Sequence, residues 1–327
     1  MESGMVVLLS TGGTIEMVST DSGLDIGSGA SAPPAGGSVV PEGVDLEHRA
    51  LFSLPSPHVS PAMMWSLAAE ISEELSREDV RGVVVTHGTD TLEESAFLAD
   101  LLVPPGKPVA FTAAMRSASE LGVDGPRNVM GAIRTVCTNE LHNLGVTVVL
   151  NDEIHSALRV TKTYTSNVSS FASPGYGPVG YVDDDRVLLR RRPALHIDLS
   201  GRADCLEERV GLVKLAAGYG AGQLKAAVDS GCRGVVVEAF GRGNAPPEVA
   251  EQLERAVRRG VLVAVCSRCY MGRVLGVYGY PGGGADLKRR GAVMAGDLPG
   301  HKVRLLLMVC LGAGMDRGEV EDLLSAF

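Results

Sequence analysis

Two short segments of the sequence bring together hydroxyl groups, glycines and a carboxylate in patterns that could carry chemistry. The first is Ser10-Thr-Gly-Gly-Thr14, and the second is Thr86-His-Gly-Thr-Asp-Thr91. Glycines let the backbone turn sharply and direct amide groups toward a ligand. Thr14 and Thr89 would each offer a hydroxyl nucleophile, and Asp90 a carboxylate at a helix start, where the helix dipole favours its charge. Taken singly, either loop is also typical of an ordinary turn or helix cap.

Both segments follow apolar runs that have the length and composition of buried strands. We expect strands over residues 6–10, 82–86, 108–112 and 146–151, and helices over 63–75, 92–102 and 127–136. Alternating strands and helices predict an α/β fold with a parallel sheet covered on both faces. Ligands of such sheets bind beyond the carboxyl ends of the strands, where the strand order reverses, so the two segments would meet there. Gly12-Gly13 lacks the spacing of a dinucleotide fingerprint.

The sequence changes character near residues 181–200, where acidic and basic runs and a proline replace the apolar alternation. We therefore place a larger N-terminal α/β domain at 1–185, a linker at 186–207 and a smaller C-terminal α/β domain at 208–327. In the C-terminal domain we expect strands over 209–215, 234–239 and 261–266, and helices over 222–230, 247–259 and near the C-terminus. Residues 18–48 show no periodicity and predict a long loop, which in compact domains often acts as a lid.

Composition and charge exclude several classes of function. The chain has 327 residues, a formal net charge of -9 and only short basic runs, at 190–192 and 288–290, so it lacks the basic patch of a nucleic-acid-binding protein. No apolar run approaches the roughly 20 residues that span a bilayer, and the N-terminal run has no signal-peptide pattern. Cys266-x-x-Cys269 has no second pair to complete a metal site. We expect reduced cysteines, no metal, a cytoplasmic location, and neither nucleic acid nor membrane as a partner.

The order and content of the motifs resemble the bacterial-type asparaginase/glutaminase amidohydrolases. The two signature loops match Thr11-Gly-Gly-Thr-Ile15 and His87-Gly-Thr-Asp-Thr-Leu-Glu-Glu94, and further motifs match along nearly the whole chain, at residues 112–117, 124–128, 160–163, 171–180, 241–244 and 272–278. The resemblance implies an asparaginase-like fold, hydrolysis of a side-chain amide through an acyl-enzyme, and no cofactor. It also implies a small-molecule amide substrate and a homodimer or homotetramer.

The same resemblance assigns roles to four residues. It makes Thr14 the usual candidate nucleophile and places Thr89, Asp90 and Lys162 in a second group. In that group the lysine lowers the pKa of the threonine or accepts its proton, and the aspartate fixes the lysine and holds the substrate amine. A lysine can serve as such a base because desolvation lowers the pKa of an amine. Backbone amides after Thr14 and around Thr89 and Ala114 would form the oxyanion hole. Which threonine attacks stays open.

Two departures from the family pattern lie where specificity is set. The family's flexible loop commonly carries a tyrosine that helps to activate the first threonine, whereas the first tyrosine of this chain is Tyr164. The serine that holds the substrate carboxylate falls on Ser56, and the glutamine that often follows it falls on Pro57, which has no side-chain donor and no backbone N–H. His58, beside it, is a candidate for substrate recognition.

Two residues of the second domain, Asn244 and Tyr278, are candidates to reach the substrate from a neighbouring subunit, with packing as the alternative for Tyr278. The leading hypothesis is hydrolysis of L-asparagine to L-aspartate and ammonia. One alternative is the same mechanism on a different or modified amide, which Pro57 and the loop without tyrosine favour. Others are a non-catalytic ligand-binding homologue, which the intact Thr89, Asp90 and Lys162 disfavour, and the asparaginase-like subunit of a tRNA amidotransferase, which would need an additional N-terminal domain.

Overall fold

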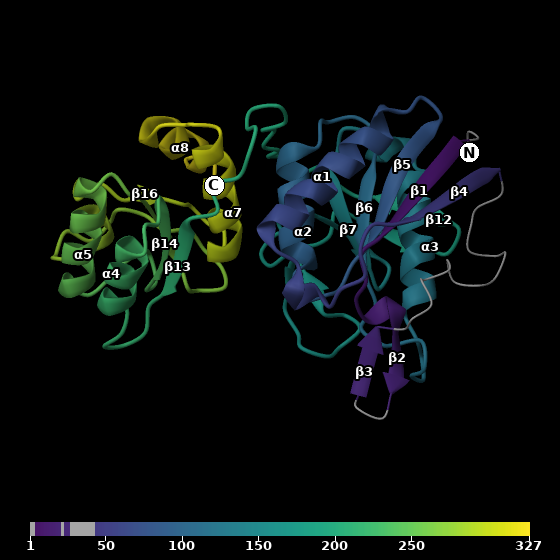
Figure 1. The fold of residues 1–327 in the computed structure, drawn as a ribbon, viewed down its shortest axis with the longest axis horizontal. Helices are drawn as coiled ribbons and strands as arrows, with labels where there is room; N and C mark the ends of the chain where they lie inside the picture. Colours follow the sequence, from purple (N-terminus) through teal and green to yellow (C-terminus); the bar gives the residue numbers. More distant parts are fainter. Residues whose placement is uncertain (1–3, 21–22, 27–42) are drawn as a thin grey trace. The chain divides into compact units, whose positions relative to one another are not determined.

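The computed structural model describes residues 4–20, 23–26 and 43–327, and the chain divides into two compact units, Met1–Ser200 and Gly201–Phe327. Each unit is described by itself (Figure 1). The expected linker at 186–207 begins too early, because Arg186–Leu189 forms strand β12, paired with β11 (Gly180–Asp183) in the sheet of the first unit. Asp184, with φ of 52°, turns the chain between these two strands. The acidic residues 183–185 and Arg186, which suggested a linker, therefore belong to the exposed turn of a hairpin, whereas the basic run 190–192 follows it.

The first unit is built on an eight-stranded sheet in the order β12-β11-β8-β7-β6-β5-β1-β4. Its other strands are β1 (Gly4–Ser10), β4 (Val44–Ala50), β5 (Val80–Thr86), β6 (Val109–Thr112), β7 (Val146–Leu150) and β8 (Glu153–Ser156). From β7 to β4 all neighbours are parallel, whereas β8, β11 and β12 add antiparallel pairs at the other edge. The chain reaches β4 on one side of β1 and β5 on the other, so the strand order reverses at β1.

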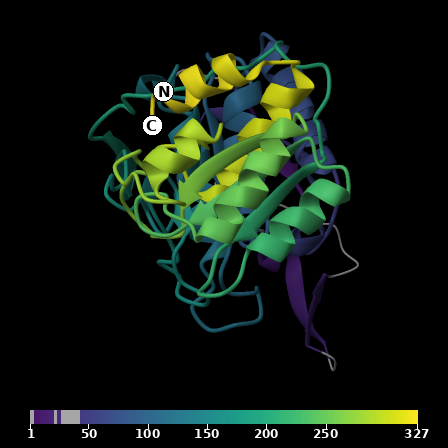
Figure 2. The same cartoon turned by 90° about the vertical axis from the view of Figure 1, so that its left-hand side faces the viewer.

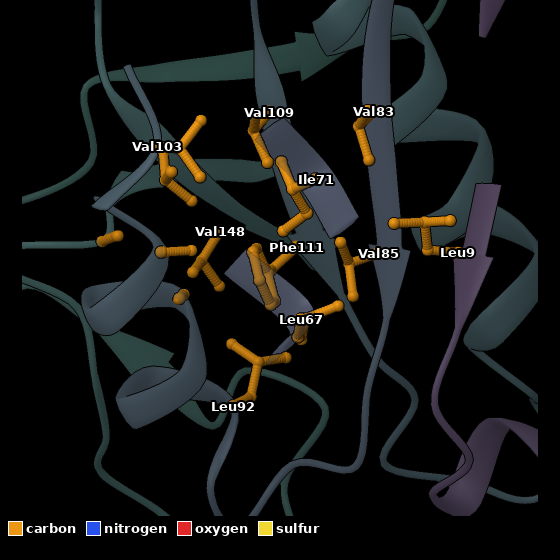
Figure 3. Close-up of a cluster of buried hydrophobic side chains, with 14 of the residues drawn as sticks. Leu9, Leu67, Ile71, Val83, Val85, Leu92, Val103, Val109, Phe111 and Val148 are labelled. Carbon is orange, nitrogen blue, oxygen red and sulfur yellow. The ribbon is translucent and has the colours of Figure 1, made fainter. Parts of the chain in front are cut away.

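Helices cover both faces of this sheet. The helices α1 (Pro61–Ser76) and α2 (Leu92–Leu102) pack on one face, and α3 (Gly125–Val136) packs on the other (Figure 1). Successive residues of β1 serve the two faces in turn: Val7 and Leu9 join the cluster under α1 and α2, shown in Figure 3, whereas Val6 and Leu8 join the cluster under α3. Each such fully buried side chain contributes about 1.5–3 kcal/mol, which explains why strands buried on both faces read as continuous apolar runs.

Shorter elements complete the first unit. They are the hairpin β2 (Met17–Thr20) and β3 (Gly23–Ile26), the ribbon β9 (Thr161–Lys162) and β10 (Phe171–Ala172), and the 3-10 helices η1 (Thr14–Glu16), η2 (Ser56–His58) and η3 (Asn139–Leu141). The prediction of an irregular loop over 18–48 is wrong where the chain forms β2, β3 and β4. Strand β4 is an edge strand that buries only Val44, so its sequence shows little apolar pattern. Residues 21–22 and 27–42, where a lid was expected, lie outside the described residues.

The second unit has a four-stranded parallel sheet in the order β13-β14-β15-β16. Its elements are β13 (Val210–Lys214), α4 (Ala221–Asp229), β14 (Gly234–Ala239), α5 (Pro247–Arg258), β15 (Leu262–Ser267), α6 (Gly284–Arg289), β16 (Val293–Met294), α7 (Gly300–Gly312) and α8 (Arg317–Leu324). Figure 2 views the face that carries α4 and α5, and α7 packs on the opposite face. The strands and helices expected for this unit are confirmed. Among the described residues, no helix is both long and apolar enough to span a membrane.

Candidate functional site

Three loops meet where β1, β4 and β5 end, at the point of strand reversal. Thr11, in the loop after β1, donates its backbone N–H and its Oγ1 to the carbonyl of Thr86, over 3.1 and 2.9 Å. The Thr11 carbonyl in turn accepts the N–H of Leu54, in the loop after β4, over 3.2 Å. These contacts fix the three loops to one another, as the parallel register of these strands allows.

The glycines of both signature loops are required by close contact between these loops. Gly13 has φ of 90°, and a Cβ there would overlap the Cα and N of Gly88. A Cβ on Gly88 would lie 2.6 Å from the Cβ of Ser56. No side chain fits at either position without moving backbone, so the Gly-Gly and His-Gly-Thr patterns mark a contact between loops.

Lys162, Thr89 and Asp90 form one hydrogen-bonded group. Lys162 Nζ donates to Thr89 Oγ1 over 2.9 Å and to Asp90 Oδ1 over 2.7 Å. Thr89 is buried, the Lys162 side chain is 16% exposed, and the Asp90 side chain is 57% exposed. The family resemblance implied this grouping, in which Lys162 lies more than 70 positions from the other two residues. An amine within hydrogen-bond distance of a hydroxyl is the arrangement in which an unprotonated lysine accepts the hydroxyl proton.

Ser56 joins the same group from the loop after β4. Its buried Oγ accepts the backbone N–H of Asp90 over 3.1 Å, and its carbonyl accepts Thr91 Oγ1 over 2.8 Å. The hydroxyl hydrogen of Ser56 remains able to donate to a ligand. Pro57 and His58 follow on η2 and are exposed. Pro57 occupies an early position of this 3-10 helix, where a missing N–H costs little.

Thr14 and Ala114 lie on loops that approach each other beside Gly125. A Cβ on Gly125 would lie 3.0 Å from Ile15 Cγ1 and 3.4 Å from Ala114 Cβ. Thr14 is half-buried at the start of η1, and Ala114 is buried. Within the part of the chain that the structure describes, no side chain hydrogen-bonds the Thr14 hydroxyl. Thr14 and Thr89 thus differ, because among the described residues only the Thr89 hydroxyl is hydrogen-bonded to a side chain that can act as a base.

Sequence reasoning assigned no role to Asp124, although its motif was visible. The Asp124 carboxylate accepts the backbone N–H groups of Met115 and Arg116 over 3.0 and 2.9 Å, and it also accepts Asn128 Nδ2. Asn128 Nδ2 further donates to the carbonyl of Ala113. The two residues therefore fix the loop after β6. The Asp-Gly-Pro-x-Asn spacing was the available signal, but only the fold shows which loop it holds.

His87 is a buried residue that supports the signature loop after β5. Its ring is fully buried, with Nδ1 2.8 Å from the carbonyl of Gly88 and Nε2 2.9 Å from Ser95 Oγ. Because a carbonyl only accepts, Nδ1 carries the hydrogen and Nε2 accepts from the serine. Burial lowers the pKa of His87 to about 4, so the ring is neutral near pH 7. His87 therefore has a structural role, which its place in the motif also favours.

Asn244 and Tyr278 belong to the second unit. Asn244 Oδ1 accepts the N–H of Gly284 over 3.1 Å, which fixes the loop after β14. Tyr278 is 44% exposed, and its ring centroid lies 5.6 Å from that of Tyr280. Their approach to a substrate stays a prediction.

The described residues contain no cluster of three or more His, Cys, Asp or Glu side chains that could hold a metal ion. Cys266 is buried in β15, which raises the pKa of its thiol, whereas Cys269 is exposed. The arrangement at the ends of β1, β4 and β5 instead offers hydroxyl, amine and carboxylate groups, which suit acyl transfer.

Comparison with known proteins agrees with this chemistry. Residues 5–195 match the family model described as asparaginase, N-terminal, and residues 209–324 match the glutaminase/asparaginase C-terminal domain. A probable L-asparaginase of Deinococcus radiodurans is 39% identical over 96% of this chain and 95% of its own length. One subunit of the glutamyl-tRNA(Gln) amidotransferase of Thermofilum pendens is 32% identical over 98% of this chain and 73% of its own length.

Among solved structures, a probable cytoplasmic L-asparaginase from Campylobacter jejuni matches with a TM-score of 0.85 and 29% identity, over 99% of both chains. Both family models together cover nearly the whole sequence, and the fold and motifs agree with them. The chain therefore belongs to the asparaginase family of amidohydrolases.

Proposed function

We propose that this chain hydrolyses the side-chain amide of L-asparagine to L-aspartate and ammonia through an acyl-enzyme on a threonine. The observation that carries the proposal is the contact of Lys162 Nζ with both Thr89 Oγ1 and Asp90 Oδ1. The L-asparaginase names of similar proteins support asparagine as the substrate.

The reaction proceeds in two acyl transfers. A threonine Oγ attacks the amide carbon while its proton passes to a base, the tetrahedral intermediate collapses, and ammonia leaves with a proton. Water then attacks the resulting ester and releases the carboxylic acid and the free threonine. Lys162, when unprotonated, is the base available to Thr89, and backbone N–H groups after Thr14 and near Ala114 stabilise the developing oxyanion.

Substrate binding is assigned to the groups around Ser56. The Ser56 hydroxyl would donate to the α-carboxylate, and Asp90 would hold the α-ammonium group with Oδ2, since its Oδ1 binds Lys162. His58, exposed on η2, would contact the amino-acid end of the substrate.

A second candidate is an amide whose amino-acid end is modified or absent. The observation that favours it is Pro57, which is exposed beside Ser56 and has no donor for that end. Ammonia release from L-asparagine, D-asparagine, L-glutamine and amides without an amino group separates the candidates. Turnover of L-asparagine at low concentration supports the main proposal, turnover of amine-free amides alone supports the second, and no turnover of any amide contradicts both.

The attacking threonine is found by trapping. Rapid quenching during turnover of a slow amide, followed by peptide mass spectrometry, would locate the acyl group on Thr14 or Thr89. Thr14→Val and Thr89→Val should each lower kcat, and only the variant that lacks the nucleophile should fail to accumulate any acyl-enzyme.

We also propose a homodimer or homotetramer, in which Asn244 and Tyr278 reach the site of a neighbouring copy. Light scattering of the purified protein measures the mass of the assembly. A monomer with full activity would contradict this part of the proposal. The cytoplasmic location stays a prediction.

A further inference from the structure

Lys162 is held in an exposed part of the chain. It lies in β9, a strand of two residues, whose ladder partner is the equally short β10, with Lys162 opposite Phe171. Residues 163–167 between these strands are exposed. The two ladder pairs and the bonds of Thr163 to the Ser170 carbonyl form only a short anchor for a group that must hold its Nζ within hydrogen-bond distance of Thr89 Oγ1.

A buried carboxylate supplies an additional anchor. Glu93, in the first turn of α2, is 8% exposed, and its Oε1 accepts the backbone N–H of Lys162 over 3.2 Å. Asp90, three residues earlier, accepts from Nζ of the same lysine. The start of α2 thus binds both the backbone and the amine of Lys162.

The location of Glu93 fits a positioning role. Burying a carboxylate is costly unless hydrogen bonds and nearby positive charge compensate. The N-terminus of α2 supplies favourable dipole charge, and a charged acceptor makes a stronger hydrogen bond to the Lys162 N–H than a neutral one does. By accepting the Lys162 backbone N–H, this carboxylate connects α2 to the ribbon that carries the amine.

We infer that Glu93 is a positioning residue: its hydrogen bond to the Lys162 backbone sets the distance between Lys162 Nζ and Thr89 Oγ1. The inference rests on the proposed function, in which Lys162 accepts the threonine proton. It assigns Glu93 no contact with the substrate, so loss of the hydrogen bond should lower kcat and leave KM for L-asparagine nearly unchanged.

Three substitutions separate the hydrogen bond from the charge. Glu93→Gln keeps an acceptor oxygen of the same reach and should retain kcat within about threefold. Glu93→Asp keeps the charge but is one methylene shorter, and Glu93→Ala removes the acceptor; both should lower kcat about 30-fold, with KM changed less than about threefold. The control is Glu73→Gln, which removes an exposed carboxylate from α1 and should not change either constant.

Circular dichroism and thermal unfolding establish that each variant is folded. If Glu93→Ala does not fold, the comparison of Glu93→Asp with Glu93→Gln decides. Wild-type kcat in Glu93→Asp, or equal losses in the Gln and Asp variants, overturns the inference.

The Lys162→Met background distinguishes failure of this inference from failure of the proposed function. If Lys162→Met alone keeps wild-type activity, the proposed mechanism fails. If it is impaired, Glu93→Ala should cost less than about twofold more in that background, because the group it positions is gone. A further 30-fold loss there would show that Glu93 acts on another group, and would overturn the inference alone.

Discussion

The loops that follow the parallel strands of the two units differ in what their polar side chains bind. In both units backbone and side-chain hydrogen bonds join the loops, as between Thr11 and Thr86 in the first unit. In the first unit Lys162 also bonds to the side chain of Thr89. In the second unit Ser267 Oγ donates to the backbone carbonyl of Gly241 over 2.6 Å.

The difference shows what a parallel sheet needs in order to carry a site. Both units have crossover helices and strands that end in glycine-containing loops. Asn244 and Arg268 of the second unit, however, bond to backbone groups of their own unit, those of Gly284 and Leu215. In the first unit, Lys162, Thr89 and Asp90 bond to one another through side-chain atoms, so that an amine, a hydroxyl and a carboxylate lie together. Matched substitutions in the two units test this difference.

The largest difference is expected between two lysines that each bind an aspartate, one in each unit. Lys162→Met removes the proposed base and should lower kcat for L-asparagine by about 10³-fold, since it eliminates proton transfer and the positioned amine. Lys225→Met, which removes the exposed i,i+4 pair with Asp229 on α4, should leave kcat unchanged and alter the free energy of unfolding little. Steady-state ammonia release measures both, and equal kcat values in the two variants would contradict the comparison.

A second pair of substitutions concerns glycines. Gly88→Ala forces a Cβ against Ser56 and should destabilise the first unit by about 1–3 kcal/mol, with loss of activity. Gly222→Ala, at an open position in α4, should instead stabilise the second unit by about 0.5–1 kcal/mol. Urea unfolding followed by Trp65, the single tryptophan, reports on α1 of the first unit, and unfolding followed by circular dichroism reports on the helices of both units. A Gly88→Ala protein as stable as the wild type would show that the loops can separate freely.

Acid should destabilise the first unit through His87. Its pKa is about 4 when folded and near 6.5 when unfolded, so the unfolded chain binds the extra proton. The stability that depends on a neutral His87 is therefore fully present above pH 6.5 and is lost as the pH falls toward 4. At pH 5 this loss lowers the free energy of unfolding by about 2 kcal/mol. In His87→Asn, Trp65-detected urea unfolding should depend less on pH between 7 and 5 than in the wild type. The same pH dependence in both proteins would exclude a buried neutral His87.

The smallest effects are expected from two serines. Ser56→Ala should raise KM for L-asparagine about tenfold, the loss of one hydrogen bond to the substrate carboxylate. Ser267→Ala should leave KM unchanged and reduce stability by about 1 kcal/mol. The Ser267 hydroxyl donates to the carbonyl of Gly241 and accepts the backbone N–H of Cys269. Steady-state kinetics and thermal unfolding of both variants decide whether the two serines differ in this way.

Much of the fold follows from the sequence because its central strands are buried on both faces. The apolar runs that contain Val83 and Val148 can be read directly, and so can the helices between them. Strand β4 escaped prediction since an edge strand buries little, and β12 did so because its hairpin is charged. Pairing with a neighbour, which defines both strands, depends on residues distant in sequence.

For the site, too, the sequence predicts which residues take part better than it predicts their contacts. The motifs identified Thr89, Asp90 and Lys162, and the structure brings these side chains together. The contacts of Glu93 and Asp124 could not be predicted, because each carboxylate binds backbone N–H groups whose location depends on the folded loops. Because every residue except proline has a backbone N–H, residue type does not show which N–H a carboxylate will bind.

The contact between Gly13 and Gly88 limits how this site can be altered. Any side chain on either glycine would push two backbones apart, so neither position can be used to change substrate range. The exposed Pro57 and His58 follow Ser56 on η2, and their side chains contact solvent instead. Libraries that vary these two residues, with both glycines retained, are therefore the direct route to new amide specificity on this scaffold.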